Sequence, residues 1–208
     1  MKDFEVLVKE AEQRLIKKNL EDIKKNIDNS DYTLKIQNYC DKFGFLFEDV
    51  KQQILTNDLV ASFFAKDPSK QNFTEKLVEE LLNSKVLPQL GKNCVRFTQD
   101  GEIVSKKAPN ASKSADFLIN NIYITQKYTR STGGAQDNQF NDVVDFLIKG
   151  SKKHKVAAIV DGSFWDDKRD ELKFFFKDNS NVSILSMNDI LNGGFSFEWC
   201  TENPTLFK

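Results

Sequence analysis

The feature that most constrains the fold is the alternation of strand and helix patterns in the second half of the chain. Strand patterns over residues 122–128, 156–160 and 182–185 are separated by helical patterns over 135–149 and 167–177. Strands that are joined through a helix pair in parallel, with right-handed crossovers. No polar residue interrupts 156–160, which is typical of a buried strand. The sequence therefore predicts an α/β protein whose central sheet is flanked by helices.

Two hairpins precede this alternation and add antiparallel strands to the prediction. Residues 94–98 and 102–106 flank Asp100-Gly101, a strong hairpin signal. Residues 115–119 and 122–128 flank Asn120-Asn121, and asparagine tolerates the positive φ of a tight turn. We therefore expect a mixed sheet, with antiparallel strands before the parallel ones.

The first third of the chain has only helical patterns. Residues 3–28 form a long amphipathic pattern, and residues 32–66 indicate two or three further helices. A helix over 73–83 follows, for which Asn72 and Glu75 make a plausible capping box. We expect a helical region over 1–70 that serves dimerisation or embraces DNA, and an α/β core over 71–208.

The composition excludes several classes of protein. The 208 residues include three cysteines, far apart in the sequence, and one histidine. These cysteines predict free thiols and a cytoplasmic location rather than a disulfide framework or a zinc site. With a single histidine, His154, we do not expect a zinc hydrolase with several histidine ligands, an HNH nuclease or Cys/His catalysis. No apolar run is long enough to predict a membrane-spanning helix.

The net charge of −1 hides an uneven distribution. Residues 106–155 contain nine basic and four acidic side chains, whereas residues 161–208 contain nine acidic and five basic ones. Such polarity permits a face that binds a polyanion such as DNA. Solvated surface lysines explain the same charge count equally well.

The turn at Asn120-Asn121 predicts the register of the second hairpin. The expected pairs are Ile119 with Ile122, Leu118 with Tyr123, Phe117 with Ile124 and Asp116 with Thr125. Alternation then directs Phe117, Ile119, Ile122 and Ile124 toward the core. Asp116, Thr125 and Lys127 share the opposite face, so a carboxylate, a hydroxyl and an ammonium meet on one patch.

This group of side chains suits phosphodiester hydrolysis. An aspartate is a hard oxygen ligand of the kind that Mg²⁺ prefers. A divalent ion neutralises developing charge and activates water, while a nearby lysine can orient the nucleophile. The alternative is an ordinary surface ion pair, worth at most about 1 kcal/mol.

The same residues resemble a known nuclease motif. Ser112-Lys113-Ser114-Ala115-Asp116, followed by a hairpin and Thr125-Gln126-Lys127, is similar to the PD-(D/E)xK motif of type II restriction endonucleases. The resemblance covers roughly residues 73–195 and extends through the segment from Tyr128 to Gln139. It implies a restriction-endonuclease-like core with a mixed central sheet, and a Mg²⁺-dependent cleavage of DNA.

The resemblance also implies roles for individual residues. Asp116 matches the metal-binding aspartate, Lys127 the catalytic lysine and Glu75 the acid that many members carry on the preceding helix, although Glu75 can equally be a capping residue. Thr125 stands where the family has a second acid. Three explanations are open. The second acid comes from the next helix, as Asp142 or Asp137, or Asp116, Thr125, Glu75 and the substrate phosphate are sufficient to hold one Mg²⁺ ion. In the third, the nuclease activity has been lost.

The segment after Lys127 contains candidates for DNA contact. Gly133-Gly134 before a helix lets backbone N–H groups approach a phosphate, although such a pair is often only a turn. Amide side chains offer the donors and acceptors that base edges require, and arginine reads guanine or holds phosphate. The candidates are Lys113, Arg130, Gln136, Asn138 and Gln139.

These observations predict a Mg²⁺-dependent type II restriction endonuclease that hydrolyses double-stranded DNA at a short specific site. We expect a homodimer, because two antiparallel strands are most simply cut by a two-fold pair of sites. We expect no membrane association. The alternative is a catalytically inactive DNA-binding protein on the same fold.

Overall fold

The computed structural model describes residues 3–105, 108, 110–130 and 136–193. The chain divides into two compact units, one of Leu7–Thr74 and one of Met1–Val6 with Glu75–Lys208. The boundary expected from the sequence lies between residues 70 and 71, and the structure divides the chain four residues later. It also groups the first six residues with the C-terminal unit.

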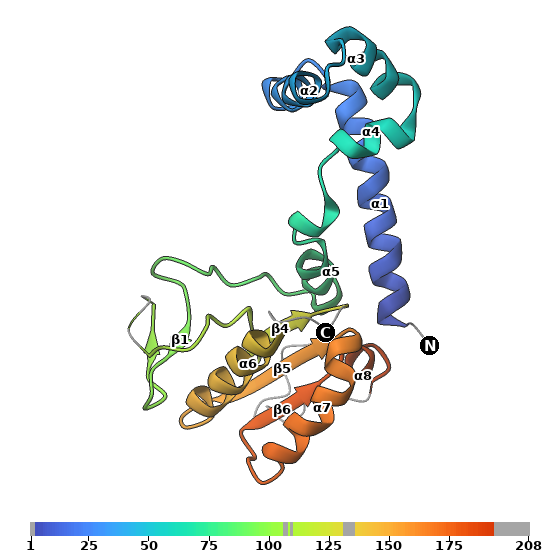
Figure 1. Ribbon diagram of the computed structural model, residues 1–208. Helices are drawn as coiled ribbons and strands as arrows, with labels where there is room; N and C mark the ends of the chain where they lie inside the picture. Colours follow the sequence, from blue (N-terminus) through green and yellow to red (C-terminus); the bar gives the residue numbers. More distant parts are fainter. Residues whose placement is uncertain (1–2, 106–107, 109, 131–135, 194–208) are drawn as a thin grey trace. The chain divides into compact units, whose positions relative to one another are not determined.

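The Leu7–Thr74 unit is entirely helical. It contains most of α1 (Phe4–Lys25), then α2 (Ser30–Phe43), α3 (Phe47–Thr56), α4 (Asp58–Phe64) and the short 3₁₀-helix η1 (Pro68–Lys70) (Figure 1). Asn29 caps α2 by accepting the Asp31 N–H, and Gly44 ends that helix in the left-handed conformation. The buried core is made of Ile23, Ile27, Tyr32, Ile36, Cys40, Val50, Ile54, Ala61 and Phe64.

Helix α5 (Phe73–Leu82) lies where the sequence predicts a helix, but its start differs from the prediction. An N-cap residue has an extended backbone, whereas Asn72 has a φ of 49°. The predicted capping box of Asn72 and Glu75 is therefore wrong. Glu75 lies in the first turn of α5, and its side chain is half-buried.

The C-terminal unit contains a mixed four-stranded sheet, as the sequence predicts. The strand order is β3 (Phe117–Ile119), β4 (Ile122–Tyr128), β5 (Lys155–Asp161) and β6 (Val182–Leu185). The β3–β4 pair is antiparallel, and β4–β5 and β5–β6 are parallel. The hairpin at Asp100-Gly101 forms a separate two-stranded sheet of β1 (Arg96–Phe97) and β2 (Ile103–Val104).

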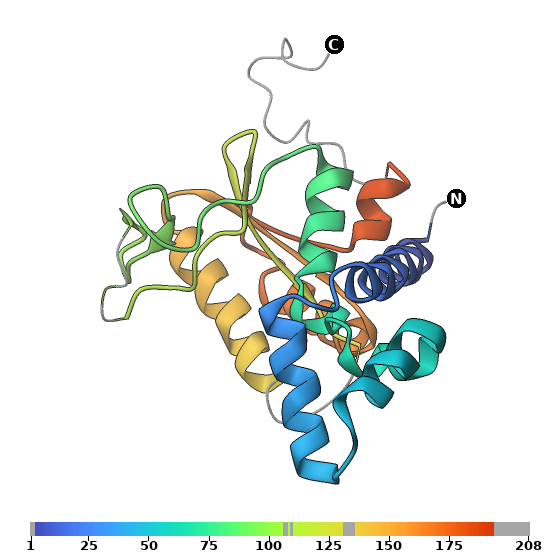
Figure 2. The same ribbon diagram turned by 90° about the horizontal axis from the view of Figure 1, so that it is seen from above.

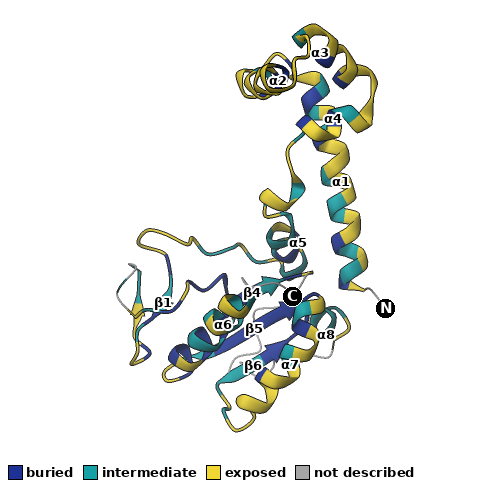
Figure 3. Ribbon diagram, in the orientation of Figure 1, coloured by how far each residue is buried: buried dark blue, intermediate teal, exposed yellow. Residues whose placement is uncertain are grey.

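Helices lie on both faces of the four-stranded sheet. Helices α6 (Gln136–Gly150) and α7 (Ser163–Phe175) lie on one face, and α5 and α8 (Met187–Leu191) lie on the other (Figures 1 and 2). The core below α6 and α7 includes Phe97, Val143, Phe146, Leu147, Val156, Ala158, Val160, Trp165 and Leu172. Residues 156–161 of β5 are all buried (Figure 3). This double cover explains the run without polar residues in β5.

None of the helices that the structure describes could cross a membrane. The longest, α1, has 22 residues but carries charged side chains along its whole length. Cys40 and Cys94, the two cysteines within the described part, are buried free thiols.

Candidate functional site

The β3–β4 hairpin positions the candidate site. Asn120 and Asn121 have φ values of 50° and 63°, which is the left-handed backbone that a tight two-residue turn requires. The register pairs Ile119 with Ile122, Leu118 with Tyr123 and Phe117 with Ile124. These three predicted pairs are confirmed.

The predicted fourth pair, Asp116 with Thr125, does not form. The Asp116 N–H donates to the Ile124 carbonyl at 2.7 Å, although Ile124 is already the partner of Phe117. Two residues thus lie opposite one, as at a β-bulge, which changes the direction of a side chain. The Asp116 carbonyl accepts the Leu87 N–H at 2.7 Å, which ties this position to the segment after α5.

The Asp116 carboxylate is nevertheless the point where the predicted side chains meet. Its Oδ2 atom accepts the Gln126 backbone N–H at 2.7 Å, the Thr125 hydroxyl at 3.2 Å and the Lys127 ammonium at 3.3 Å. Among the described residues, no donor lies within hydrogen-bonding distance of Oδ1. One oxygen is held by the protein, and the other is left for a further partner.

This group is more buried than an exposed sheet face would be. Asp116 is 5% exposed and Thr125 is 2% exposed, whereas the Lys127 side chain retains 26% of its exposure. Tyr123, which shares the face of Thr125 and Lys127, packs against the core below α6. The hairpin therefore has apolar packing on both faces, and within the polar group Asp116 and Thr125 are buried while Lys127 remains partly exposed.

Lys127 carries the accessible charge of the group. Its Nζ atom donates to the Gln126 carbonyl at 2.9 Å as well as to Asp116. A charge-assisted pair that is partly removed from water is stronger than an exposed one, because the local dielectric is lower. The ammonium is held in place and still partly open to solvent.

Glu75 lies close enough to this pair for its charge state to respond. Burial raises the pKa of the Glu75 carboxyl, and the negative charge of Asp116 raises it further. The Lys127 ammonium opposes the shift, and Glu79 adds to it. When both carboxyl groups are ionised, the two carboxylates and the one ammonium carry a net negative charge.

Asp142, the acid expected from the following helix, is held elsewhere. It lies on α6 and forms an ion pair with Lys113 at 3.7 Å. Within the described ranges, no three His, Cys, Asp or Glu side chains gather as a metal site would require. The structure brings Glu75 toward Asp116 but does not add Asp142 to them. Asp137, the other candidate, lies in the first turn of α6 near Lys168.

The candidate DNA-contacting residues fall into two groups. Arg130 and Asn138 are exposed, and Lys113 retains 61% of its side-chain exposure. Gln136 and Gln139 are half-buried, and Gln139 accepts the Thr129 hydroxyl at 2.8 Å. That bond links the end of β4 to α6, so Gln139 has a structural role. Gly133-Gly134 lies outside the described residues.

Arg130 is supported by an aromatic ring. Its Nε atom donates to the Tyr128 hydroxyl at 2.6 Å, and its guanidinium lies 5.5 Å from the centroid of that ring. The Tyr128 hydroxyl donates to Glu5 at 2.9 Å. Burial and the Glu5 charge raise the pKa of Tyr128 to about 12, so the phenol stays protonated as a donor.

Asp161 is a second buried carboxylate, which was not predicted from the sequence. It lies on β5, the strand that pairs with β4. Asp161 ends β5, pairs with Tyr128 and is 5% exposed. Burial raises its pKa to about 7, against the opposing effects of the Met187 N–H and of Arg169. An acid directly after an apolar strand, where carboxyl ends of parallel strands meet, is the signal that could have found it.

Comparison with family models, with curated proteins and with solved structures found no match. The resemblance to PD-(D/E)xK nucleases therefore depends on the residues of this chain alone, above all on Asp116 and Lys127.

Proposed function

We propose that the chain is a Mg²⁺-dependent endodeoxyribonuclease of the PD-(D/E)xK type, which hydrolyses double-stranded DNA at a short specific site. The observation that carries the proposal is the contact between the Asp116 carboxylate and the Lys127 ammonium at 3.3 Å. The charges of both groups also act on the pKa of Glu75, which burial raises. The order of helix, hairpin, helix and parallel strand around this contact supports a restriction-endonuclease-like core.

The acidic side of the site is suited to a divalent cation. Burial raises the pKa of Glu75, the negative charge of Asp116 raises it further, and Asp116 Oδ1 has no donor within the described structure. Mg²⁺ is commonly bound by one or two carboxylates together with substrate phosphate, so a third acid is not essential. When bound, the ion would neutralise charge on the phosphate and activate a water molecule.

The other side chains have roles that follow from their contacts. The Gln126 N–H and the Thr125 hydroxyl hold one oxygen of Asp116, which fixes the direction of the other. Lys127, with its partly exposed ammonium, orients the attacking water and stabilises negative charge as it develops on the phosphate. Arg130, Asn138 and Lys113 are exposed and would contact DNA.

The proposal includes a homodimer, because a two-fold pair of sites matches the symmetry of two antiparallel strands. It is tested by incubating plasmid DNA with the purified protein and Mg²⁺. Discrete fragments with defined ends are the expected result. Intact plasmid at all Mg²⁺ concentrations would contradict the proposal, provided that the protein is folded.

A second candidate is a DNA-binding protein on the same fold that does not cleave. It is favoured by Thr125 at the position of the second acid, and by the lack of a three-ligand cluster among the described residues. Retarded DNA in a gel-shift assay with EDTA, together with intact plasmid in Mg²⁺, would support this candidate over the nuclease.

A further inference from the structure

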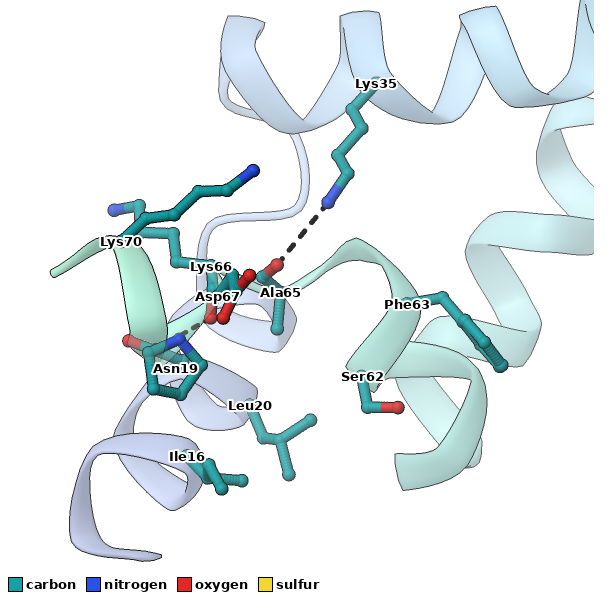
Figure 4. Close-up of a pocket in the computed structure, with 11 residues that line it drawn as sticks. Ile16, Asn19, Leu20, Lys35, Ser62, Phe63, Ala65, Lys66, Asp67 and Lys70 are labelled. Carbon is teal, nitrogen blue, oxygen red and sulfur yellow. Dashed lines mark hydrogen bonds between the residues drawn. The ribbon is translucent and has the colours of Figure 1, made fainter. Parts of the chain in front are cut away.

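The helical Leu7–Thr74 unit contains a cavity of about 470 Å³ that the proposed active site does not use. Residues from α1, α2, α4 and the segment through η1 line it (Figure 4). Three of the lining residues, Lys35, Lys66 and Lys70, are lysines, and one, Asp67, is an acid. The unit as a whole contains equal numbers of basic and acidic residues. The lining of the cavity therefore has an excess of positive charge that the unit as a whole does not have.

Lys35 places a partly desolvated ammonium at this cavity. It donates to the carbonyls of Phe64 at 3.0 Å and Ala65 at 3.4 Å, at the C-terminal end of α4. Burial lowers the pKa of Lys35, and the charge of Lys70 lowers it further. Capping of α4 explains the two carbonyl contacts, but it does not explain why a second cation is placed nearby.

Lys70 is that second cation, and its charge acts on the pKa of Asp67. Within the described residues its side chain forms no hydrogen bond or ion pair. Figure 4 shows Lys35 and Lys70 reaching from different elements toward the same space above Asp67. The Lys66 ammonium, in contrast, is paired with Asp22 at 3.3 Å.

The nearby acid does not cancel this charge. Asp67 accepts the Ser69 N–H at 2.9 Å, and its pKa is lowered first by the Ser69 hydroxyl and N–H and then by the two lysines. One carboxylate faces two ammonium groups, so a positive charge remains. The opposite wall is apolar, with Ile16, Leu20 and the largely exposed ring of Phe63.

We propose that Lys35 and Lys70 together bind a phosphate of the DNA backbone, with the sugar against the apolar wall. The inference rests on the proposed DNA substrate and adds a contact outside the active site. A phosphodiester presents two charged oxygens to two ammonium groups, relieves their mutual repulsion and releases counterions. A free phosphate has the same chemistry, and the experiment separates the two sources.

The test measures binding of the full chain to a short fluorescent duplex in EDTA, over a range of salt concentrations. Each lost phosphate contact makes the slope of log K against log salt shallower by about 0.9. Because both lysines contact one phosphate, we expect part of that change for Lys70→Gln and the full change of about 0.9 for Lys35→Gln with Lys70→Gln. Lys18→Gln with Lys42→Gln, which removes the same charge from exposed positions of the same unit, is the matched control.

An unchanged slope in Lys70→Gln would overturn the inference, and this variant removes no internal contact that affects folding. If the variants keep the wild-type slope and the protein cleaves plasmid, the proposed phosphate site is wrong and the proposed nuclease activity is supported. Shallower slopes combined with intact plasmid would support the site and reject the nuclease. If inorganic phosphate perturbs the Lys35 and Lys70 resonances while the DNA slope is unchanged, the DNA assignment is overturned in favour of a small phosphate.

Discussion

Asp116 lies just before β3 and Asp161 ends β5 of the same sheet, and the two are equally buried, at 5% exposure, but their surroundings differ. Asp116 accepts from an ammonium, a hydroxyl and a backbone N–H. Within the part of the chain that the structure describes, Asp161 accepts from one backbone N–H, that of Met187, which reaches both oxygens at 3.1 Å. Burial raises the pKa of Asp161 to about 7, because the Met187 N–H and the charge of Arg169 offset the cost of burial only in part.

The largest expected effect separates the two carboxylates by activity. Asp116→Asn and Lys127→Ala should each reduce plasmid cleavage by about a hundredfold to a thousandfold, because each removes a group that stabilises charge at the phosphate. Asp161→Asn, at an equally buried carboxylate at the end of β5, is the matched control and should cleave at the wild-type rate near neutral pH. Equal losses in all three variants would remove the distinction between the two sites.

The second prediction concerns the stability of the Asp161 region. Its folded pKa of about 7 exceeds the ordinary value of 3.8, so the folded protein holds a proton that the unfolded chain releases between those values. The free energy of unfolding should therefore fall as pH rises from about 4 to about 7, by about 4 kcal/mol in total for this group. Below that window, the group has no effect.

Asp161→Asn measures this contribution directly. The amide oxygen can still accept the Met187 N–H, but the side chain has no charge to bury. Urea unfolding of both proteins should show the variant gaining stability relative to the wild type as pH rises through the window. A constant difference between the two proteins at all pH values would show that Asp161 keeps an ordinary pKa.

The third prediction tests whether Glu75 belongs with Asp116. Glu75→Gln removes a carboxylate and relieves repulsion, so the protein should need about tenfold more Mg²⁺ for half-maximal cleavage. Glu80→Gln, an exposed acid on the same helix, is the control and should leave the requirement unchanged. An unaltered Mg²⁺ requirement in Glu75→Gln would leave Asp116 as the single acid of the site.

The smallest expected effect concerns the hydroxyl that holds Asp116. Thr125→Val keeps the shape of the side chain but removes the donor at 3.2 Å, at a cost of about 1 to 2 kcal/mol in the free energy of unfolding. Thr125→Ser should retain most of the stability. If the valine variant unfolds at the wild-type urea concentration, the hydroxyl does not support the carboxylate.

Much of the hairpin could be predicted from the sequence because its rules are local. Two asparagines with positive φ set the turn, and the side-chain period of two then sets the register of three pairs. Asp116, Thr125 and Lys127 meet as predicted, although the pair of Asp116 with Thr125 on which that prediction depended does not form. The parallel strands could be predicted because the alternation of strand and helix leaves few topologies.

The features that were missed depend on contacts between distant segments. The displacement of Asp116 from the ladder involves Leu87, which lies far from the hairpin in the sequence. Asp142 forms an ion pair with Lys113, and the spacing of these residues in the sequence does not predict that pair. The raised pKa of Asp161 depends on the packing that surrounds the end of β5, and a residue pattern does not report how complete that packing is.

The start of helix α1 affects how the C-terminal unit can be produced as a separate fragment. Phe4, in its first turn, is 1% exposed, packs edge-on against Tyr128 and donates its N–H to Asn188. A recombinant fragment that begins after the helical unit would lack this ring and leave an apolar hollow beside the end of β4. A fragment that contains the sheet should therefore keep residues 1–6 of the chain, for example by circular permutation. A bulky affinity tag should not be attached next to Phe4.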